Sequence, residues 1–460
     1  MPFVPHTRAD VDAMLAEIGV EDIETLFDEI PSHLASGRLS KVPAGRSELA
    51  MLQEMQSRAS MDDGYVCYLG AGSYDHHIPA AVWDLTARGE FMTAYTPYQA
   101  EASQGTLQLI YEYQTMMANL TGMDVSNASV YDGASGLAEA VLMAVRANKK
   151  VKSGEVWLAG GVHPHYQAAC DNIVRNQGIT LRSLDLGSDG CLQRSAVDGH
   201  SSAPVALVIQ QPNFFGRLEA VDELTDWAHD NGALVVAVVN PTSLAILKPP
   251  GEWGRDGADI VCGDGQPFGV PMASGGPSFG FICCVDKFVR QMPGRIIGRT
   301  VDLDGKPGFA LTLQAREQHI RRGKATSNIC TNQGLLVTAG TIYLSLMGPQ
   351  GLREVALQCH AQTRRLRQRL LQIDGVEPFF AGPVFHEFAL RLPCPAEPLL
   401  RAMRTEGILA GLALADFVEP GVLNQDLAAR GMLVAVTEKR TDAEIDAYVD
   451  VFQRALEECS

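Results

Sequence analysis

The run ALVVAVVN, residues 233–240, is flanked by Gly232 and Pro241 and is apolar in every side chain but the last. Comparable runs occur on both sides of it, at PVALVIQQ (204–211), ADIVCG (258–263) and FGFICCV (279–285). Amphipathic helical patterns such as VDELTDWAHDN (221–231) alternate with runs of this kind. Strands that are buried on both faces have such continuous apolar sequences. We therefore predict an α/β fold, a mostly parallel sheet covered by helices on both faces, with ligands at the carboxyl ends of its strands.

Helical patterns precede this region. Residues 7–60 predict short helices, and Thr7 and Asp10 have the spacing of a capping box at the first of them. A longer helix is predicted from Gln104 to Leu120, with Gly122 as its stop signal. The alternation of strands and helices begins only after Tyr131.

The last third of the chain has a different pattern. After about residue 305 we predict helices near 308–322, 331–346 and 350–373. Two strands, HEFALRL and MLVAVT, and a final helix from Asp442 complete a small α+β domain. The chain thus divides into a helical arm (1–60), a large α/β domain (61–330), and linking helices with a small C-terminal domain (331–460).

The composition is that of an acidic globular protein. Its 460 residues, 46% of them hydrophobic, can bury a sizeable core, and the formal net charge is −17. This charge argues against wholesale binding of nucleic acid or an anionic membrane, and no run approaches the roughly 18 apolar residues of a membrane span. The ten cysteines are scattered without CxxC spacing. We expect a cytoplasmic protein with reduced thiols, no signal segment and no metal site.

Two polar segments lie where a ligand of such a sheet would bind. In YDGASG (131–136), the amides of Gly133, Ala134 and Ser135 can face an anion such as phosphate, although the spacing leaves an ordinary helix start equally open. His163 and His165 follow another strand, where an imidazole can stack on a planar ring. A capping or solvated histidine is the more common case. Neither segment identifies a function by itself.

The loop GDGQPFGVPMASGGPSFG, residues 263–280, has the glycine, proline and small polar residues of a ligand-facing turn. Its crown holds Gln266, a neutral amide that neither titrates nor forms an imine. Asn240, 26 positions earlier, also directly follows a predicted strand. The loop therefore has the composition of an active-site loop without a reactive group.

Two long stretches of the chain resemble a known family. They are AYTPYQAEASQGTLQLIYEYQTMMANLTGMDVSNASVYDGASGLAEA (94–140) and RIIGRTVDLDGKPGFALTLQAREQHIRRGKATSNICTNQ (295–333), supported by YLGAGSYDHHIPAAV (68–82) and by the loop 263–280. The family is the P-protein of the glycine cleavage system, glycine dehydrogenase (decarboxylating), and specifically the first (alpha) subunit of its split form. The resemblance runs over nearly the whole chain.

The resemblance implies fold type I of the pyridoxal-phosphate (PLP) enzymes. Such enzymes hold PLP as an imine on a lysine and place a carboxylate beside its pyridine nitrogen. In the partner (beta) subunit the lysine follows a histidine; the matching step here is Gly265–Gln266, and Asn240 stands at the aspartate position. Asn240 departs from the family, in which we expect aspartate in alpha subunits too. Lys248 lies in a proline-flanked stretch typical of a surface lysine. We expect no catalytic residue and no covalently bound PLP in this chain, and PLP on the partner.

Fold type I enzymes form dimers in which each active site is completed by the neighbouring chain. By resemblance, two polar segments are expected to reach the PLP of the partner, through Tyr95, Thr96, Tyr98, Lys324, Thr326, Ser327 and Asn328. Helix capping and interface packing are the alternative for the first segment. A second expectation concerns a mouth for the acidic H-protein, lined by Arg290, Arg295, Arg299, Arg321 and Arg322. Solvated surface charge is the alternative for these arginines.

The implied function is that of a non-PLP-carrying half of glycine decarboxylase. The complete enzyme would release CO2 from glycine and pass the aminomethyl group to the lipoyl arm of H-protein. One or two alpha-beta pairs, the latter a heterotetramer, would form the assembly. Two alternatives stay open: a non-catalytic scaffold or regulatory protein that retains the fold, and a free-standing PLP enzyme with a different lysine.

Overall fold

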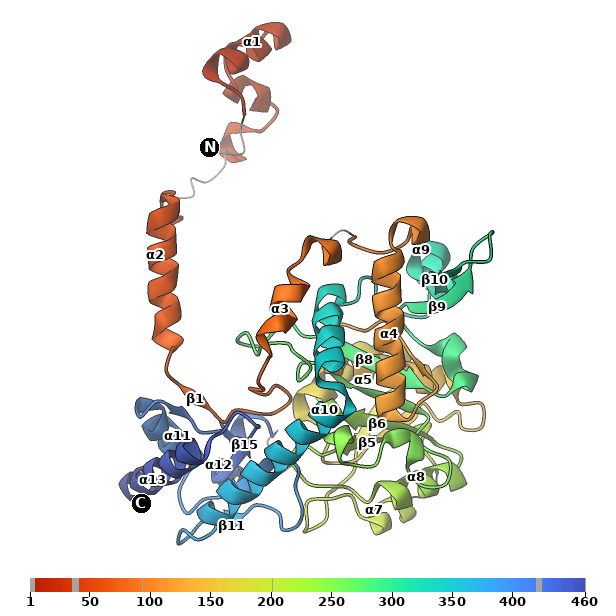
Figure 1. Ribbon diagram of the computed structural model, residues 1–460, viewed down its shortest axis with the longest axis vertical. Coiled ribbons are helices and arrows are strands. Elements are labelled where there is room, and N and C mark those ends of the chain that lie inside the picture. Colours follow the sequence, from red (N-terminus) through yellow and green to blue (C-terminus); the bar gives the residue numbers. More distant parts are fainter. Residues whose placement is uncertain (1–4, 35–40, 93, 201, 419–423, 460) are drawn as a thin grey trace. The chain divides into compact units, whose positions relative to one another are not determined.

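Seven strands form the central sheet, in the order β2-β8-β7-β6-β5-β3-β4 (Figure 1). The computed structural model describes residues 5–34, 41–92, 94–200, 202–418 and 424–459. The strands are β2 (Val125–Ser126), β3 (Glu155–Leu158), β4 (Thr180–Ser183), β5 (Ala206–Gln211), β6 (Leu234–Val239), β7 (Ile260–Asp264) and β8 (Gly280–Cys284). Strands β4, β3, β5, β6 and β7 pair in parallel, whereas β8 and β2 are antiparallel additions at one edge. The predicted mostly parallel sheet is confirmed.

Strand β6 explains why its sequence is continuously apolar. Val235, Ala237 and Val239 belong to the hydrophobic core on one face of the sheet, and Val236 and Val238 belong to the core on the other face. The first core is shared with α3 (Ala80–Thr86), α4 (Gln104–Thr121), α8 (Val221–Asp230) and α10 (Gly334–Leu370). The second is shared with α5 (Gly133–Ala147) and α6 (Pro164–Val174). Because successive side chains of a strand point to opposite faces, both must be apolar when helices cover both.

The C-terminal part forms a small α+β domain around a second sheet, in the order β11-β12-β15-β14. Its elements are β11 (Glu377–Pro378), β12 (Glu387–Arg391), α11 (Ala396–Thr405), β14 (Leu412–Ala413), α12 (Gln425–Ala429), β15 (Gly431–Ala435) and α13 (Asp442–Cys459). Beside it, β1 (Val66–Cys67) pairs in parallel with β13 (Ile408–Leu409). Helix α10 joins the domains, because Leu336 packs in the large-domain core and Leu366 in the small-domain core.

One predicted helix is wrong. Residues expected to form a helix near 308–322 instead form strand β10 (Pro307–Thr312), paired with β9 (Ile296–Val301), and then only a short helix α9 (Gln318–Arg321). Phe309 and Leu311 pack beside Ile297, so this stretch uses a two-residue period. The two helices expected at 331–346 and 350–373 are both present, as the two parts of α10, and the non-helical residue Gly348 (φ 58°) separates them just before Pro349.

Residues Met1–Asp63 form a separate unit from Gly64–Ser460. It contains α1 (Arg8–Ile18), α2 (Glu48–Ala59) and short 3-10 turns. The predicted capping box of α1 is confirmed, because Thr7 N donates to Asp10 Oδ2 (2.7 Å) and Asp10 N donates to Thr7 Oγ1 (3.3 Å). Among the described residues of this unit, Leu15 is the one buried hydrophobic side chain. The unit therefore has almost no core of its own.

Helix α10 is the one described helix that is long and apolar enough to cross a membrane by length and composition alone. Half of its most apolar stretch is buried inside the protein, and Pro349 lies within the helix. The core helix of a folded domain meets the same criterion, and the side chains that α10 shares with both domain cores fit that explanation.

Candidate functional site

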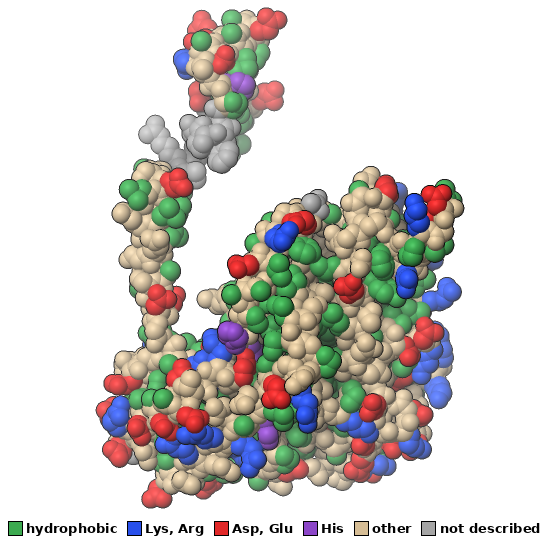
Figure 2. Space-filling view, in the orientation of Figure 1, with side chains coloured by type: hydrophobic (Ala, Val, Ile, Leu, Met, Phe, Trp, Pro, Cys, Tyr) green, Lys and Arg blue, Asp and Glu red, His purple; other side chains and the backbone are tan. Residues whose placement is uncertain are grey.

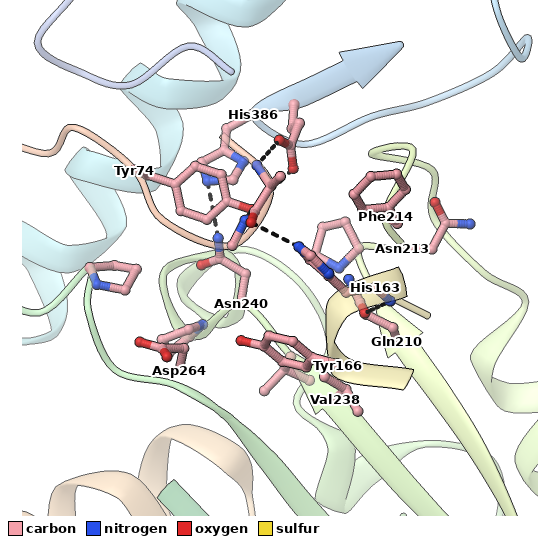
Figure 3. A pocket seen from close by; sticks show the side chains of 17 residues that line it. Tyr74, His163, Tyr166, Gln210, Asn213, Phe214, Val238, Asn240, Asp264 and His386 are labelled. Carbon is pink, nitrogen blue, oxygen red and sulfur yellow. Dashed lines mark hydrogen bonds between the residues drawn. The ribbon is translucent and has the colours of Figure 1, made fainter. Parts of the chain in front are cut away.

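A small pocket lies where β5, β6 and β7 end, between the large domain and the start of β12 (Figure 3). Its volume is about 40 Å³. Seventeen residues line it, namely Ala71, Gly72, Tyr74, His163, Tyr166, Gln210, Pro212, Asn213, Phe214, Val238, Val239, Asn240, Pro241, Asp264, Pro267, His386 and Glu387. None of these lining residues, all of them within the described ranges, is a lysine. The pocket stands at the predicted place for a ligand, the carboxyl ends of parallel strands.

Gln266 lies beside this pocket with its side-chain amide fully engaged. Its Oε1 accepts a hydrogen bond from Tyr74 N (2.9 Å), and its Nε2 donates to Tyr74 O (2.9 Å) and Val270 O (2.8 Å). The residue is 4% exposed. A buried amide with all of these partners is a structural group, and it ties the loop after β7 to the segment around Tyr74.

Asn240 is also engaged on both sides of its amide. Its Oδ1 accepts from Thr242 N (3.0 Å) and so caps the 3-10 turn Pro241–Ala245, while its Nδ2 lies 3.0 Å from His386 Nε2. Because the amide nitrogen can only donate, His386 Nε2 accepts and the imidazole is neutral. Burial lowers the pKa of His386 well below its ordinary value, in agreement with a neutral ring. Figure 3 shows this pair reaching across the pocket.

The N-terminus of α5 faces carboxylates of the same chain. Gly133 N donates to Asp264 Oδ2 (3.0 Å), and Ser135 N donates to Asp132 Oδ1 (2.7 Å). Of the three amides that were predicted to face an anion, that of Gly133 binds Asp264, and that of Ser135 binds the N-cap residue Asp132, as in the alternative of an ordinary helix start. Burial raises the pKa of Asp264 to about 6, against the opposing effect of the hydrogen bonds that it accepts.

His163 caps α6, as the more common alternative for this residue predicted. Its Nδ1 accepts from His165 N (3.1 Å), so the proton is on Nε2, which lies 2.8 Å from Ala71 O. Burial lowers the pKa of His163 to about 4, which keeps the ring neutral near pH 7. Its ring stacks on Tyr166, with centroids 5.0 Å apart, so the planar partner of the imidazole belongs to the protein itself.

Glu387, at the start of β12, connects the small domain to the segment before α3. Its Oε1 accepts from Ala71 N (2.7 Å) and its Oε2 accepts from the hydroxyl of Tyr74 (3.0 Å). Burial raises the pKa of this carboxyl to about 7. Neither Glu387 nor Tyr74 nor His386 was predicted from the sequence, because each contacts residues more than one hundred positions away and no local motif marks it.

The two segments predicted to reach the partner lie together around Arg295. Its Nη2 donates to the hydroxyl of Tyr98 (3.0 Å) and its Nη1 donates to Asn332 Oδ1 (3.3 Å). Tyr95 is 91% exposed, whereas Thr96 has a buried hydroxyl. These contacts place Tyr98 and Asn332 on one guanidinium group, and no residue of 94–99 or 323–333 lines the pocket.

The second of these segments is partly exposed. Lys324 and Asn328 are exposed, whereas Thr326 and Ser327 are half-buried. Thr326 N donates to Arg316 O (2.9 Å), and Ser327 Oγ accepts from Ile329 N (3.0 Å). Of the four residues predicted to reach the partner from this segment, Lys324 and Asn328 are therefore the ones exposed to solvent.

Arg295 itself corrects one expectation. It was expected to line a mouth for H-protein with four other arginines, but it is 4% exposed, stacks over the ring of Tyr98 and lies 3.7 Å from Glu317. The charge of Arg295 is therefore paired with Glu317 within the chain. The remaining four residues of that expected set, Arg290, Arg299, Arg321 and Arg322, are exposed.

One group of potential metal ligands occurs among the described residues. His76, Cys359 and Glu438 place their ligand atoms within 4.8 Å of one another. Glu438 Oε2 accepts from Cys359 Sγ (3.2 Å) and lies 2.7 Å from His76 Nδ1. Each of the three side chains thus has a partner within the cluster. These contacts connect the segment before α3, helix α10 and the small domain.

Comparisons with known proteins agree with this geometry. The family model "Glycine cleavage system P-protein" matches residues 1–452. A relative named probable glycine dehydrogenase (decarboxylating) subunit 1, from Thioalkalivibrio sulfidiphilus, is 58% identical over 463 residues, covering 99% of this chain and all of the relative. A relative of the same name from Alcanivorax borkumensis is also 58% identical, covering 100% of this chain and 99% of its own length.

Solved structures give the fold. The crystal structure of glycine decarboxylase (P-protein) of the glycine cleavage system, in inhibitor-bound form, has a TM-score of 0.87 at 41% identity and covers 99% of this chain and 100% of its own. Glutamate decarboxylase of Lactobacillus brevis has a TM-score of 0.66 at 12% identity, over 94% of this chain and 97% of its own, and this likeness concerns the fold alone. The fold is that of the PLP-dependent transferases. With its full-length match to first subunits, the chain belongs to the glycine cleavage system P-protein family.

Proposed function

We propose that this chain is the subunit of glycine decarboxylase that carries no PLP and that it works only in complex with a second, PLP-bearing subunit. The observation that carries the proposal is the state of Gln266, whose amide stands where a lysine would be needed and is bonded to Tyr74 and Val270. An amide cannot form the covalent link to PLP. The name "subunit 1" of the relatives supports the existence of a partner.

The complex would catalyse glycine decarboxylation with transfer to H-protein. The bond between the glycine α-carbon and its carboxyl group breaks, and CO2 leaves. The α-carbon, still carrying its amino group, forms a bond to one sulfur of the lipoyl disulfide. The disulfide accepts the electron pair, and its second sulfur takes up a proton. PLP on the second subunit supplies the electron-accepting ring for this reaction.

The contribution of this chain would be to bind the second subunit and complete its site. Figure 2 shows hydrophobic side chains over α3, α4 and α10, where Leu85, Leu335 and Leu346 are exposed. An exposed apolar face of this kind is typical of a protein–protein interface. Tyr95, Lys324 and Asn328 offer further donors at the surface. A lysine and an amide suit a phosphate or carboxylate held by the partner.

We further propose that Arg290, Arg299, Arg321 and Arg322 attract the acidic H-protein. Their exposure supports a role in encounter, since exposed charge raises association rates more than final affinity. We also propose a cytoplasmic location. All ten cysteines are free thiols, which is the usual state in a reducing compartment.

The test is reconstitution. The second subunit, loaded with PLP, and lipoylated H-protein are mixed with or without this chain, and exchange of labelled CO2 into glycine is measured. We expect exchange only with this chain present, and a loss of at least tenfold for Lys324→Ala, because one charge-assisted hydrogen bond is worth about 1.5–3 kcal/mol. Thr326→Ala is expected to lose less, because its side chain is half-buried.

Lys150→Ala is the matched control. Lys150 is exposed and lies between α5 and β3, at the amino edge of the sheet, so its loss is expected to leave exchange unchanged. Equal exchange with and without this chain would contradict the subunit assignment and favour the scaffold alternative. A pyridoxyl adduct trapped by borohydride on a lysine of this chain alone would favour a free-standing PLP enzyme.

A further inference from the structure

The N-terminus of α5 points at the end of β7, and Asp264 fills the space between them. Asp264 Oδ2 accepts from Gly133 N (3.0 Å), and Oδ1 accepts from Gln266 N (2.9 Å) and from the hydroxyl of Ser278. The unpaired amides of a helix N-terminus, assisted by the helix dipole, bind anions. In this chain the first of these donors, Gly133 N, already binds a carboxylate that comes from the adjacent strand.

The Cα of Gly133 is closely packed against Tyr166 and the backbone of Asp264. A methyl group on Gly133 would lie 2.2 Å from the hydroxyl oxygen of Tyr166 and 2.9 Å from Asp264 N. Figure 3 shows Tyr166 and Asp264 lying next to one another at the edge of the pocket.

Electrostatic repulsion also disfavours a phosphate at this position. A phosphate group carries about −1.5 to −2 charges near pH 7, so it would meet the Asp264 carboxylate at close range. Glu387 lines the same pocket and faces Ala71 and Tyr74. PLP therefore does not fit this pocket of the chain, at its phosphate end as well as at the position of the missing lysine.

We propose that Asp264 is a built-in ligand of the α5 N-terminus and that it excludes PLP and other phosphates from this chain independently of Gln266. Two separate features of the pocket, Gln266 and Asp264, thus oppose binding of the cofactor. The consequence is specific: a lysine introduced at position 266 is not sufficient to restore PLP binding, and removal of the Asp264 carboxylate is required as well.

The test compares Gln266→Lys with Gln266→Lys combined with Asp264→Ala. Each isolated chain is incubated with PLP and reduced with borohydride, and labelling at position 266 is quantified by peptide mapping, which separates it from surface lysines. We expect labelling of the single variant near the wild-type background and an increase of at least tenfold in the double variant. The matched control combines Gln266→Lys with Glu387→Gln, which changes a different carboxyl of the pocket and is expected to stay near background.

A second measurement does not depend on a new lysine. The Asp264→Ala variant leaves the amides of Gly133 and Gln266 free, so inorganic phosphate is expected to bind there and to raise its Tm by roughly 3 °C at about 100 times Kd. The wild type, compared with chloride at equal ionic strength, is expected to show no such rise. Full labelling of the single Gln266→Lys variant would overturn the proposal. So would the absence of both labelling in the double variant and phosphate-dependent stabilisation of Asp264→Ala.

Discussion

At the scale of single residues, the pocket keeps polar side chains but uses each one inside the chain. Gln266, Asn240 and Asp264 all find backbone or side-chain partners within hydrogen-bond distance. Their identities were visible in the sequence, and so was the absence of a lysine. Their partners were not, because Tyr74 lies 192 positions from Gln266 and His386 lies 146 positions from Asn240.

Replacing Gln266 by alanine is expected to destabilise the isolated chain. The change leaves Tyr74 N, Tyr74 O and Val270 O without their partner in a buried place, at a cost of about 2–4 kcal/mol. Denaturant titration measures the free energy of unfolding. Gln177→Ala, on an exposed turn, is the control and is expected to change it by less than about 0.5 kcal/mol. An equally small effect at Gln266 would show that its hydrogen bonds do not contribute to stability.

Glu387→Gln is expected to be relatively more stable at pH 8 than at pH 5. Burial raises the pKa of Glu387 from 4.5 to about 7 in the folded chain. The stabilisation that the protonated Glu387 carboxyl gives to the folded chain is therefore complete below pH 4.5 and is lost as the pH rises through 7. A glutamine at this position stays neutral throughout. Unfolding free energies of variant and wild type, measured from pH 5 to 8, should change relative to each other by up to about 3 kcal/mol. A constant difference would contradict the raised pKa.

At the scale of elements, success and failure of the sequence predictions follow from pattern length. Strand β6 was predictable because an apolar run of this kind has few alternatives. Strand β10 was not predictable, because only Phe309 and Leu311 among its six residues show the alternating apolar pattern of a strand. Their contact Ile297 belongs to another strand. Short elements obtain their conformation from tertiary partners, so local sequence identifies them poorly.

The N-terminal unit is expected to be needed for association and not for folding of the remainder. Residues 64–460 have their own cores, whereas the described part of the smaller unit exposes Leu49, Leu52 and Met55 on α2. Deletion of residues 1–63 should leave the main thermal transition in place and weaken binding to the second subunit at least tenfold in calorimetry. Changing Leu49, Leu52 and Met55 to serine should have a similar effect, and Glu48→Ser with Gln53→Ser should not. Unchanged affinity after deletion would refute this role.

At the scale of the whole molecule, α10 makes the two domains interdependent. Its first half, with Leu336 and Tyr343, completes the large-domain core, and its second half, with Leu366 and Leu370, completes the small-domain core. The general α/β class and the order of the parts followed from the sequence. The place of the pocket at the carboxyl ends of the strands followed too, but its full lining did not, because it combines residues near 71, 163, 240, 264 and 387 that only the packed chain brings together.

A fragment ending at residue 330 is therefore expected to fail to fold. It lacks Leu336, Val337 and Tyr343 and would expose the face of the sheet that they cover. Residues 64–460 are the control and should give a cooperative transition. Solubility and circular dichroism compare the two fragments. A folded, cooperative fragment 64–330 would show that α10 is dispensable for the large domain.

The carboxylate of Asp264 at the start of α5 also affects how many cofactor molecules the assembled enzyme binds. If the pocket of this chain cannot take up cofactor and PLP binds to the second subunit as proposed, a PLP titration of the assembled enzyme is expected to reach its end point at one equivalent per second subunit, whatever number of these chains is present. The visible absorbance per total chain is then half that of an enzyme with two equivalent sites. A cell that makes this chain in excess loses none of its vitamin-derived cofactor to the surplus.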